Sequence, residues 1–129
     1  MRCLVVDPST TMRRIFRNSL RSVGCDEIIE ASDGKNALEL CRGAIDAVIT
    51  EWNMPGMSGV EMVKQLRANP ETADARILMV TARNVKEDVI EATSAGVNGY
   101  LLKPFTPEAL KLKIDELFPP DVGEQQQAA

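Results

Sequence analysis

Histidine is absent from this chain of 129 residues, and cysteines and aromatic residues are scarce. Without histidine, the chain can hold no histidine-based catalytic triad, no histidine-ligated metal and no phosphohistidine. The three cysteines are odd in number, and their spacing fits no metal-binding motif. Three phenylalanines, one tryptophan and one tyrosine are few for a pocket that sandwiches a flavin.

The sequence also lacks a surplus of basic residues and a long apolar run. Its net charge of −4 argues against nucleic-acid binding, which usually needs a basic face. No run approaches the roughly 20 apolar residues that cross a bilayer, and the N-terminal stretch lacks the apolar segment of a signal peptide. We therefore expect no nucleic-acid or membrane partner, and a cytoplasmic location in which Cys3, Cys25 and Cys41 stay reduced.

Short apolar runs rich in β-branched residues alternate with segments whose apolar residues have helical spacing. The runs are CLVV (3–6), EIIEA (27–31), AVIT (47–50), ILMV (77–80) and GYLL (99–102). Five strands that alternate with five helices predict an α/β fold with a parallel sheet buried on both faces. Right-handed crossovers and the chain length favour the flavodoxin-like strand order 2-1-3-4-5.

The length allows one domain with one core. Helical spacing ends near Phe118, and the polar, glutamine-rich stretch PPDVGEQQQAA follows. We therefore predict a domain over residues 1–118 and a polar tail or linker stub over residues 119–129. Thr106 and Pro107 are predicted to begin the last helix as its N-cap and first residue.

A polar residue directly follows four of the five predicted strands. These residues are Asp7, Glu51, Thr81 and Lys103. Because ligands of open α/β sheets bind beyond the carboxyl ends of the strands, we expect the four side chains to share one shallow pocket. Alternatively, any one of these residues is polar only because the strand ends at the solvent-exposed surface. Two carboxylates and an ammonium in one crevice suit a divalent cation and a phosphoryl group.

These residues and their surroundings resemble the receiver domain of two-component response regulators, in particular the single-domain, chemotaxis-like (CheY-like) type. The resemblance covers about residues 2–118. It rests on the segments LVVD, TMRRIFRN, DAVITEWNMPGMSGVEMV, ILMVTA and AGVNGYLLKPF. It implies a role in phosphorelay signal transduction. In this family an acid pair after the first strand binds Mg²⁺, and an aspartate after the third strand takes a phosphoryl group from a histidine kinase.

The resemblance assigns roles position by position. Asp7 stands at the first acid, Thr81 at the hydroxyl and Lys103 at the lysine of the family site. Asn53 stands where a backbone carbonyl completes the metal site. Tyr100 stands at the aromatic position that rotates inward in activated members.

Two positions depart from the family pattern, and both lie in the predicted site. Pro8 stands at the second acid and offers no side-chain ligand, whereas Glu51 stands at the phosphoacceptor aspartate. Glutamate carries its carboxylate roughly 1.5 Å further along the side chain. Because phosphoryl transfer depends on positioning and charge neutralisation, we expect a degenerate site. The chain is thus interpreted as a pseudo-receiver, not an enzyme, which acts by binding a protein partner.

The metal site and the signalling state stay open at this point. Asp7, Glu51 and the Asn53 carbonyl are expected to hold Mg²⁺ weakly or not at all, and no cofactor is required. Alternatively, Glu51 pairs with Lys103 and fills the pocket as a polar plug. Such a plug would fix either the activated or the inactive state.

The resemblance also implies a partner surface on the fourth helix, the fifth strand and the fifth helix. Lys86, Asp88, Tyr100 and Lys111 would lie on or near this surface. The family's lysine–proline bond is usually cis, which we expect here at Lys103–Pro104. From the residues alone, RNVKED (83–88) is interpreted as a solvated face of the fourth helix. Trp52 is interpreted as a pocket rim or as partly exposed loop packing.

Three other functions compete with a pseudo-receiver. A working receiver would be phosphorylated on Glu51 by a histidine kinase. A small phosphotransfer or phosphohydrolase enzyme would want a second acid two residues after Asp7, where Ser9 stands and more simply caps a helix. A flavodoxin-like electron carrier would want glycine in the loop after the first strand, and DPSTT (7–11) has none.

Overall fold

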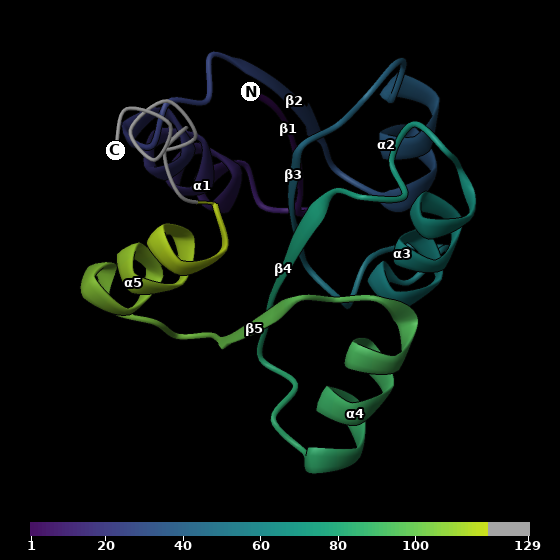
Figure 1. The fold of residues 1–129 in the computed structure, drawn as a ribbon. Helices are drawn as coiled ribbons and strands as arrows, with labels where there is room; N and C mark the ends of the chain where they lie inside the picture. Colours follow the sequence, from purple (N-terminus) through teal and green to yellow (C-terminus); the bar gives the residue numbers. More distant parts are fainter. Residues whose placement is uncertain (119–129) are drawn as a thin grey trace, which may run out of the picture.

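The computed structural model describes residues 1–118, and the predicted tail over residues 119–129 lies outside the described residues. Strands and helices alternate along the chain (Figure 1). The strands are β1 (Arg2–Val6), β2 (Glu27–Ala31), β3 (Ala47–Thr50), β4 (Arg76–Thr81) and β5 (Gly99–Leu102). The helices are α1 (Thr10–Ser22), α2 (Gly34–Leu40), α3 (Gly59–Ala68), α4 (Lys86–Ala95) and α5 (Pro107–Leu117).

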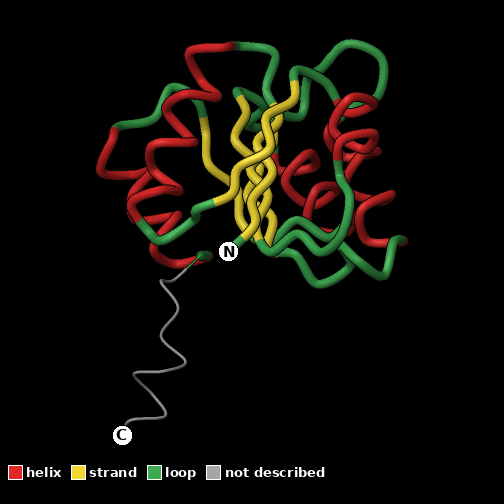
Figure 2. The backbone as a smooth tube through the Cα atoms, turned by 90° about the horizontal axis from the view of Figure 1, so that it is seen from above, coloured by secondary structure: helices red, strands yellow, loops and turns green. Residues whose placement is uncertain are grey.

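The strands form one parallel sheet in the order β2-β1-β3-β4-β5, which confirms the predicted flavodoxin-like fold. Figure 2 shows the sheet in the middle of the molecule with helices on both sides. Phe16 of α1 and Ile114 of α5 belong to the core on one face of the sheet. Ala37 of α2, Val63 of α3 and Ala92 of α4 belong to the core on the other face.

Successive residues of β1 face opposite layers of the fold. Val5 joins the core beneath α1 and α5, whereas Leu4 and Val6 join the core beneath α2, α3 and α4. The central strands β1, β3 and β4 are buried over most of their length because helices cover both faces. The edge strands β2 and β5 are mostly half-buried, so the expected full burial holds only for the central strands.

Side-chain caps fix the helices that begin next to the strand ends. The Ser9 hydroxyl caps α1, Ser58 forms a capping box at the start of α3, and Thr106 caps α5 as predicted. The peptide bond between Lys103 and Pro104 is cis, as the resemblance implies. The three caps fix the starts of the helices that follow Asp7, Glu51 and Lys103 of the predicted pocket.

Two of the cysteines are joined, contrary to expectation. Cys3 in β1 and Cys25 in the connection between α1 and β2 form a disulfide, and Cys41 is free. The connection returns beside β1, which brings the two Cα atoms within 6.6 Å of each other. The predicted cytoplasmic location was argued from reduced cysteines, which the disulfide does not support, and it stays a prediction. Within residues 1–118, none of the helices has the length and apolar character to span a membrane.

Gly59 lets the start of α3 pack directly against the end of β3. Its N–H donates to the Trp52 carbonyl at 2.8 Å, and a Cβ at this position would overlap the carbonyl oxygen of Glu51. Gly59→Ala is therefore expected to lower the free energy of unfolding by about 2 kcal/mol, because the obstructing atom is backbone. Urea unfolding measures this loss.

The matched control is Gly34→Ala at the start of α2. There the added Cβ meets only the flexible side chain of Met57, whose sulfur would lie 3.2 Å away. This variant should change the free energy of unfolding by less than about 1 kcal/mol. Equal losses in the two variants would show that the contact between Gly59 and β3 does not restrict this position.

Candidate functional site

The structure places the four predicted polar side chains together at the carboxyl edge of the sheet. Asp7, Glu51 and Thr81 are buried, and the Lys103 side chain is 19% exposed. The Lys103 ammonium donates to Oδ2 of Asp7 at 2.8 Å and to Oε1 of Glu51 at 2.9 Å. One cation thus bridges two carboxylates that are far apart in the sequence.

The register of the sheet explains this meeting. Val6 of β1 lies opposite Thr50 of β3, so the next residues, Asp7 and Glu51, emerge side by side. On the other side of β3, the Lys103 N–H donates to the carbonyl of Thr81 at 2.9 Å as β5 leaves β4. The lysine then has the length to reach across the end of β4 to both acids.

Both oxygens of the Glu51 carboxylate have partners. Oε1 accepts from Lys103, and Oε2 accepts from the backbone N–H groups of Trp52 at 2.7 Å and Asn53 at 3.1 Å. Burial acts to raise the pKa of Glu51, but the Thr81 hydroxyl, Lys103 and the Asn53 N–H outweigh it and lower this pKa. Glu51 is therefore a charged carboxylate held in one position at neutral pH.

The lysine is held in its charged form by the same contacts. Burial acts to lower the pKa of Lys103, but hydrogen bonds to Asp7 and Glu51 outweigh it and raise this pKa. The second oxygen of Asp7 accepts from the Ser9 N–H at 2.8 Å, and the Arg13 guanidinium donates to the Asp7 carbonyl at 2.6 Å. The pocket is thus a charge-paired cluster with few unused acceptors.

The residues present do not fit a Mg²⁺ site of the family kind. Mg²⁺ takes oxygen ligands in nearly octahedral geometry, and the exposed Pro8 offers none. No three His, Cys, Asp or Glu side chains within residues 1–118 form a group that could hold a metal. Lys103 already lies between the two carboxylates that remain. The weak site of Asp7, Glu51 and the Asn53 carbonyl stays a prediction.

Trp52 and Arg83 differ from their sequence interpretation. Trp52 is only 5% exposed and belongs to the core beneath α2, α3 and α4, so the interpretation as partly exposed packing is wrong, although Trp52 also lines a surface hollow. Arg83 precedes α4 and does not lie on its solvated face. The Arg83 guanidinium stacks over the Trp52 ring, 4.6 Å from its centroid, and donates to Oδ1 of Asn53 at 2.9 Å. No local pattern signals this contact between two separate loops.

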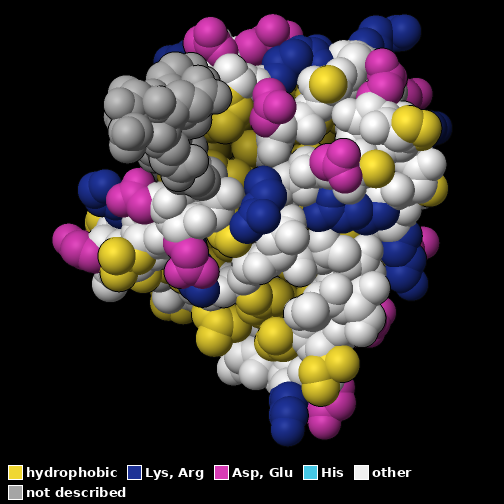
Figure 3. Space-filling model, viewed as in Figure 1, with side chains coloured by type: hydrophobic (Ala, Val, Ile, Leu, Met, Phe, Trp, Pro, Cys, Tyr) yellow, Lys and Arg dark blue, Asp and Glu magenta, His cyan; other side chains and the backbone are white. Residues whose placement is uncertain are grey.

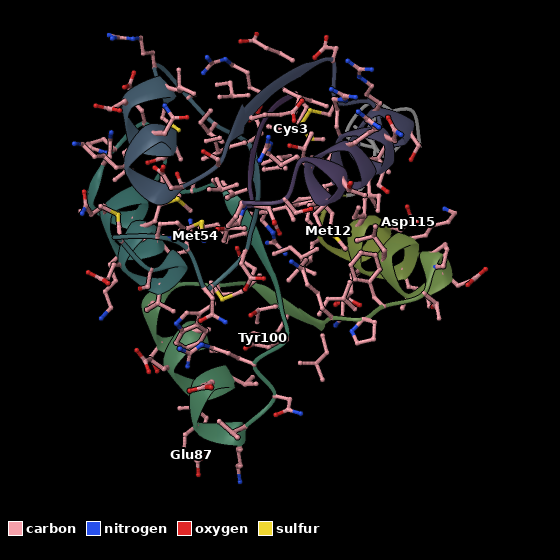
Figure 4. All side chains as sticks on the ribbon, turned by 180° about the vertical axis from the view of Figure 1, so that it is seen from behind. Cys3, Met12, Met54, Glu87, Tyr100 and Asp115 are labelled. Atoms are coloured by element: carbon pink, nitrogen blue, oxygen red, sulfur yellow. A yellow bond between two sulfur atoms is a disulfide. The ribbon has the colours of Figure 1, made fainter. Side chains whose placement is uncertain are left out.

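The residues expected on the partner surface differ in their accessibility. Lys86 and Lys111 are exposed, whereas Asp88 is half-buried and pairs with Arg83 at 3.3 Å. Tyr100 lies at β5 beside α4 (Figure 4), and its hydroxyl donates to the Arg83 carbonyl at 2.9 Å. Burial, with the charge of Asp88 next, raises the pKa of Tyr100, so the hydroxyl remains a donor at neutral pH.

Known proteins resemble the chain over most of its length. A family model described as the response regulator receiver domain matches residues 3–115. Chemotaxis protein CheY-3 of Vibrio cholerae is 48% identical over 119 residues, which are 92% of this chain and 92% of that protein. Chemotaxis protein CheY of Pseudomonas aeruginosa is 45% identical over 119 residues, which are 92% of this chain and 96% of that protein.

Solved structures agree with the sequence relatives. The structure of the chemotaxis response regulator CheY4 of Vibrio cholerae has a TM-score of 0.81 and 33% identity, over 91% of this chain and 98% of that chain. A second solved structure is the receiver domain of sensor histidine kinase PA1611 from Pseudomonas aeruginosa, with a magnesium ion coordinated in its active site cleft. It has a TM-score of 0.76 and 25% identity, over 90% of this chain and 95% of that chain. With a matching family model and relatives of nearly half-identical sequence, the chain belongs to the CheY-like receiver domains of response regulators.

Proposed function

We propose that the chain is a receiver with a degenerate phosphorylation site whose output is the binding of a protein partner. One observation carries this proposal: the Lys103 ammonium is hydrogen-bonded to both Asp7 and Glu51. In this proposal the Lys103 ammonium supplies the positive charge that a metal ion would supply in a working receiver. The longer carboxylate of Glu51 supplies the negative charge that a phosphoryl group would supply.

The geometry of Glu51 supports poor acceptor chemistry. An attacking carboxylate needs an oxygen lone pair aimed at the incoming phosphorus and cations that neutralise the developing charge. In Glu51, one oxygen is bonded to Lys103 and the other to two backbone N–H groups. These hydrogen bonds are charge-assisted and therefore strong, so they hold the carboxylate in this orientation and leave only the second lone pair of Oε1 for attack.

The donor set around the acids supports the loss of metal-dependent chemistry. The PA1611 receiver, which is 25% identical to this chain, carries a magnesium ion in its cleft. This chain has Pro8 at the second acid position and an ammonium between Asp7 and Glu51. We infer that Lys103 serves as the internal counter-ion of the site.

The position of Tyr100 favours the activated-like alternative for the polar plug. Its ring packs against the core beneath α2, α3 and α4, and its hydroxyl is bonded to the Arg83 carbonyl. An inward aromatic residue is what the resemblance associates with activated receivers. We therefore infer that the chain presents one constitutive, partner-binding state.

The surface formed by α4, β5 and α5 is the partner site that we propose. Val85, Ile90, Leu102 and Leu112 are 51%, 53%, 43% and 69% exposed. Figure 3 shows apolar side chains gathered over β5 between α4 and α5. An exposed apolar patch with a charged rim, here Lys86 and Lys111, is typical of protein–protein contact sites.

A working receiver is the second candidate, because Asp7, Thr81 and Lys103 keep the family's residue types at their positions. In that case the partner includes a histidine kinase, and Glu51 is the acceptor. The small-enzyme alternative has less support. Its second acid position holds Ser9, whose hydroxyl accepts the N–H of Met12 as a helix cap.

Removing the internal counter-ion should destabilise the fold. Lys103→Met leaves Asp7 and Glu51 facing each other without a cation, and breaking a buried pair costs about 3 kcal/mol. Lys111→Met, which removes an exposed ion pair with Asp115, should cost less than about 0.5 kcal/mol. Urea unfolding near pH 7 compares the two variants, and equal losses would refute the role of Lys103.

The loss in Lys103→Met should also depend on pH. The pKa of Glu51 is lowered in the fold, so its contribution is complete above its ordinary value of 4.5 and disappears as the pH falls through the folded-state pKa. The pKa of Lys103 is raised, so its contribution persists until the pH rises above 10.5. The difference between wild type and Lys103→Met should therefore be largest between these limits and shrink in acid.

Phosphorylation is tested by incubating the chain with acetyl phosphate and Mg²⁺ and measuring the intact mass. We expect no phosphoryl adduct, because Glu51 is displaced and engaged while Pro8 supplies no metal ligand. A phosphorylatable receiver domain of the same family serves as the positive control. A hydroxylamine-labile adduct that disappears in Glu51→Gln would instead establish the working receiver.

Restoring the family residues should restore the chemistry only when both are restored. Pro8→Asp with Glu51→Asp is expected to gain acetyl-phosphate-dependent modification and Mg²⁺ binding. Glu51→Asp alone should gain little, because the metal would still lack a ligand. If the single variant gains both properties in the mass and Mg²⁺ titration assays, Pro8 does not limit the site.

A further inference from the structure

Arg83 lies in the short segment between β4 and α4, and it contacts three other elements around the site. Its guanidinium carbon lies 4.6 Å from the centroid of the Trp52 ring, and its Nε donates to Oδ1 of Asn53 at 2.9 Å. Its Nη1 lies 3.3 Å from Oδ2 of Asp88 in α4. Its backbone carbonyl accepts the Tyr100 hydroxyl from β5 at 2.9 Å.

Trp52 and Asn53, which the guanidinium contacts, also hold the acid of the site. The backbone N–H groups of Trp52 and Asn53 are the donors to Oε2 of Glu51. Contacts therefore run without a gap from the Glu51 carboxylate, through this loop and the Arg83 side chain, to Tyr100. Asp88 is one of the charged groups that act on the Tyr100 hydroxyl. Its carboxylate accepts a hydrogen bond from the Arg83 guanidinium.

Attraction, not crowding, keeps the Arg83 side chain in place. A hollow of about 400 Å³ adjoins it, lined by Trp52, Asn53, Met54, Pro55, Ser58 and Arg83 itself. The side chain therefore has room to turn away, yet it lies over the indole and bonds on two sides. A planar guanidinium suits this combination of stacking and directed hydrogen bonds, and a lysine ammonium does not.

We propose that Arg83 is a positioning residue that keeps Tyr100 inward without a phosphoryl group. Its side chain anchors the segment between β4 and α4 to Trp52, Asn53 and Asp88. This anchoring holds the Arg83 carbonyl in the position where it accepts the hydrogen bond from the Tyr100 hydroxyl. This proposal rests on the proposed function for its signalling meaning, but the position of Tyr100 can be measured whether or not Glu51 accepts a phosphoryl group.

The experiment uses the fact that the full chain has a single tyrosine. Incorporation of 3-fluorotyrosine gives one ¹⁹F NMR signal, and the chain in denaturant provides the shift of an exposed ring. In wild type the signal should lie away from this reference. In Arg83→Ala the ratio of inward to outward ring should fall by about tenfold or more, which moves the averaged signal toward the reference or adds a second signal.

Two variants make the result specific to the guanidinium. Arg83→Lys keeps a charge near Asp88 but loses the stacking on Trp52 and the planar donors to Asn53 and Asp88, so its shift should lie between wild type and Arg83→Ala. Arg14→Ala removes an exposed arginine of α1, on the other face of the sheet, and should leave the signal unchanged. Far-UV circular dichroism monitors folding, and if Arg83→Ala does not fold, the shift in Arg83→Lys decides.

An unmoved ¹⁹F signal in folded Arg83→Ala, or the same movement in Arg14→Ala, would overturn the proposal. Trp52, the only tryptophan, provides a second readout. Its fluorescence should change in Arg83→Ala and Arg83→Lys and not in Arg14→Ala, because the stacked cation is removed or misplaced. A phosphoryl adduct on Glu51 would refute the proposed function alone, whereas an unmoved ring would refute only the role of Arg83.

Discussion

The charge of the Lys103 ammonium, shared between Asp7 and Glu51, is the constraint on which the site depends. Two carboxylates this deeply buried would repel each other and lose their hydration without a cation between them. The PA1611 receiver domain, in contrast, has a magnesium ion coordinated in its active site cleft. Here the Lys103 ammonium, which is part of the chain, compensates one of the two negative charges.

The longer acid fits this arrangement. An aspartate ends one methylene earlier, whereas the Glu51 carboxylate lies where Lys103 meets one oxygen and two backbone N–H groups meet the other. These three hydrogen bonds occupy most of the roughly four lone-pair sites of the carboxylate, which leaves little for a phosphoacceptor reaction. Stability and reactivity thus oppose each other at this one side chain, and we infer that this chain has the stable arrangement. Arg83, Trp52 and Tyr100 extend the same fixed arrangement to the surface of α4 and β5.

The sequence predicted the fold and the meeting of the strand-end residues because both follow from local patterns. Apolar runs of strand length and their order along the chain determine a parallel sheet, and the sheet determines which residues share its carboxyl edge. The Thr106 cap was likewise readable, since a helix cap depends on adjacent residues, whereas the cis bond between Lys103 and Pro104 was expected only from the family resemblance. The stacking of Arg83 on Trp52 and the joining of Cys3 to Cys25 were not readable, because each depends on how separate loops return beside the sheet.

We propose that Lys103 takes the place of a metal ion beside Asp7 and Glu51, and a Mg²⁺ titration followed by Trp52 fluorescence tests this role. Trp52 is the only tryptophan, and its backbone N–H donates a hydrogen bond to the Glu51 carboxylate, which a metal ion would have to bind. With Lys103 as the counter-ion, the emission should stay constant through millimolar Mg²⁺ at constant ionic strength. A saturable change at millimolar Mg²⁺ that is absent with the same ionic strength of Na⁺ would contradict the claim.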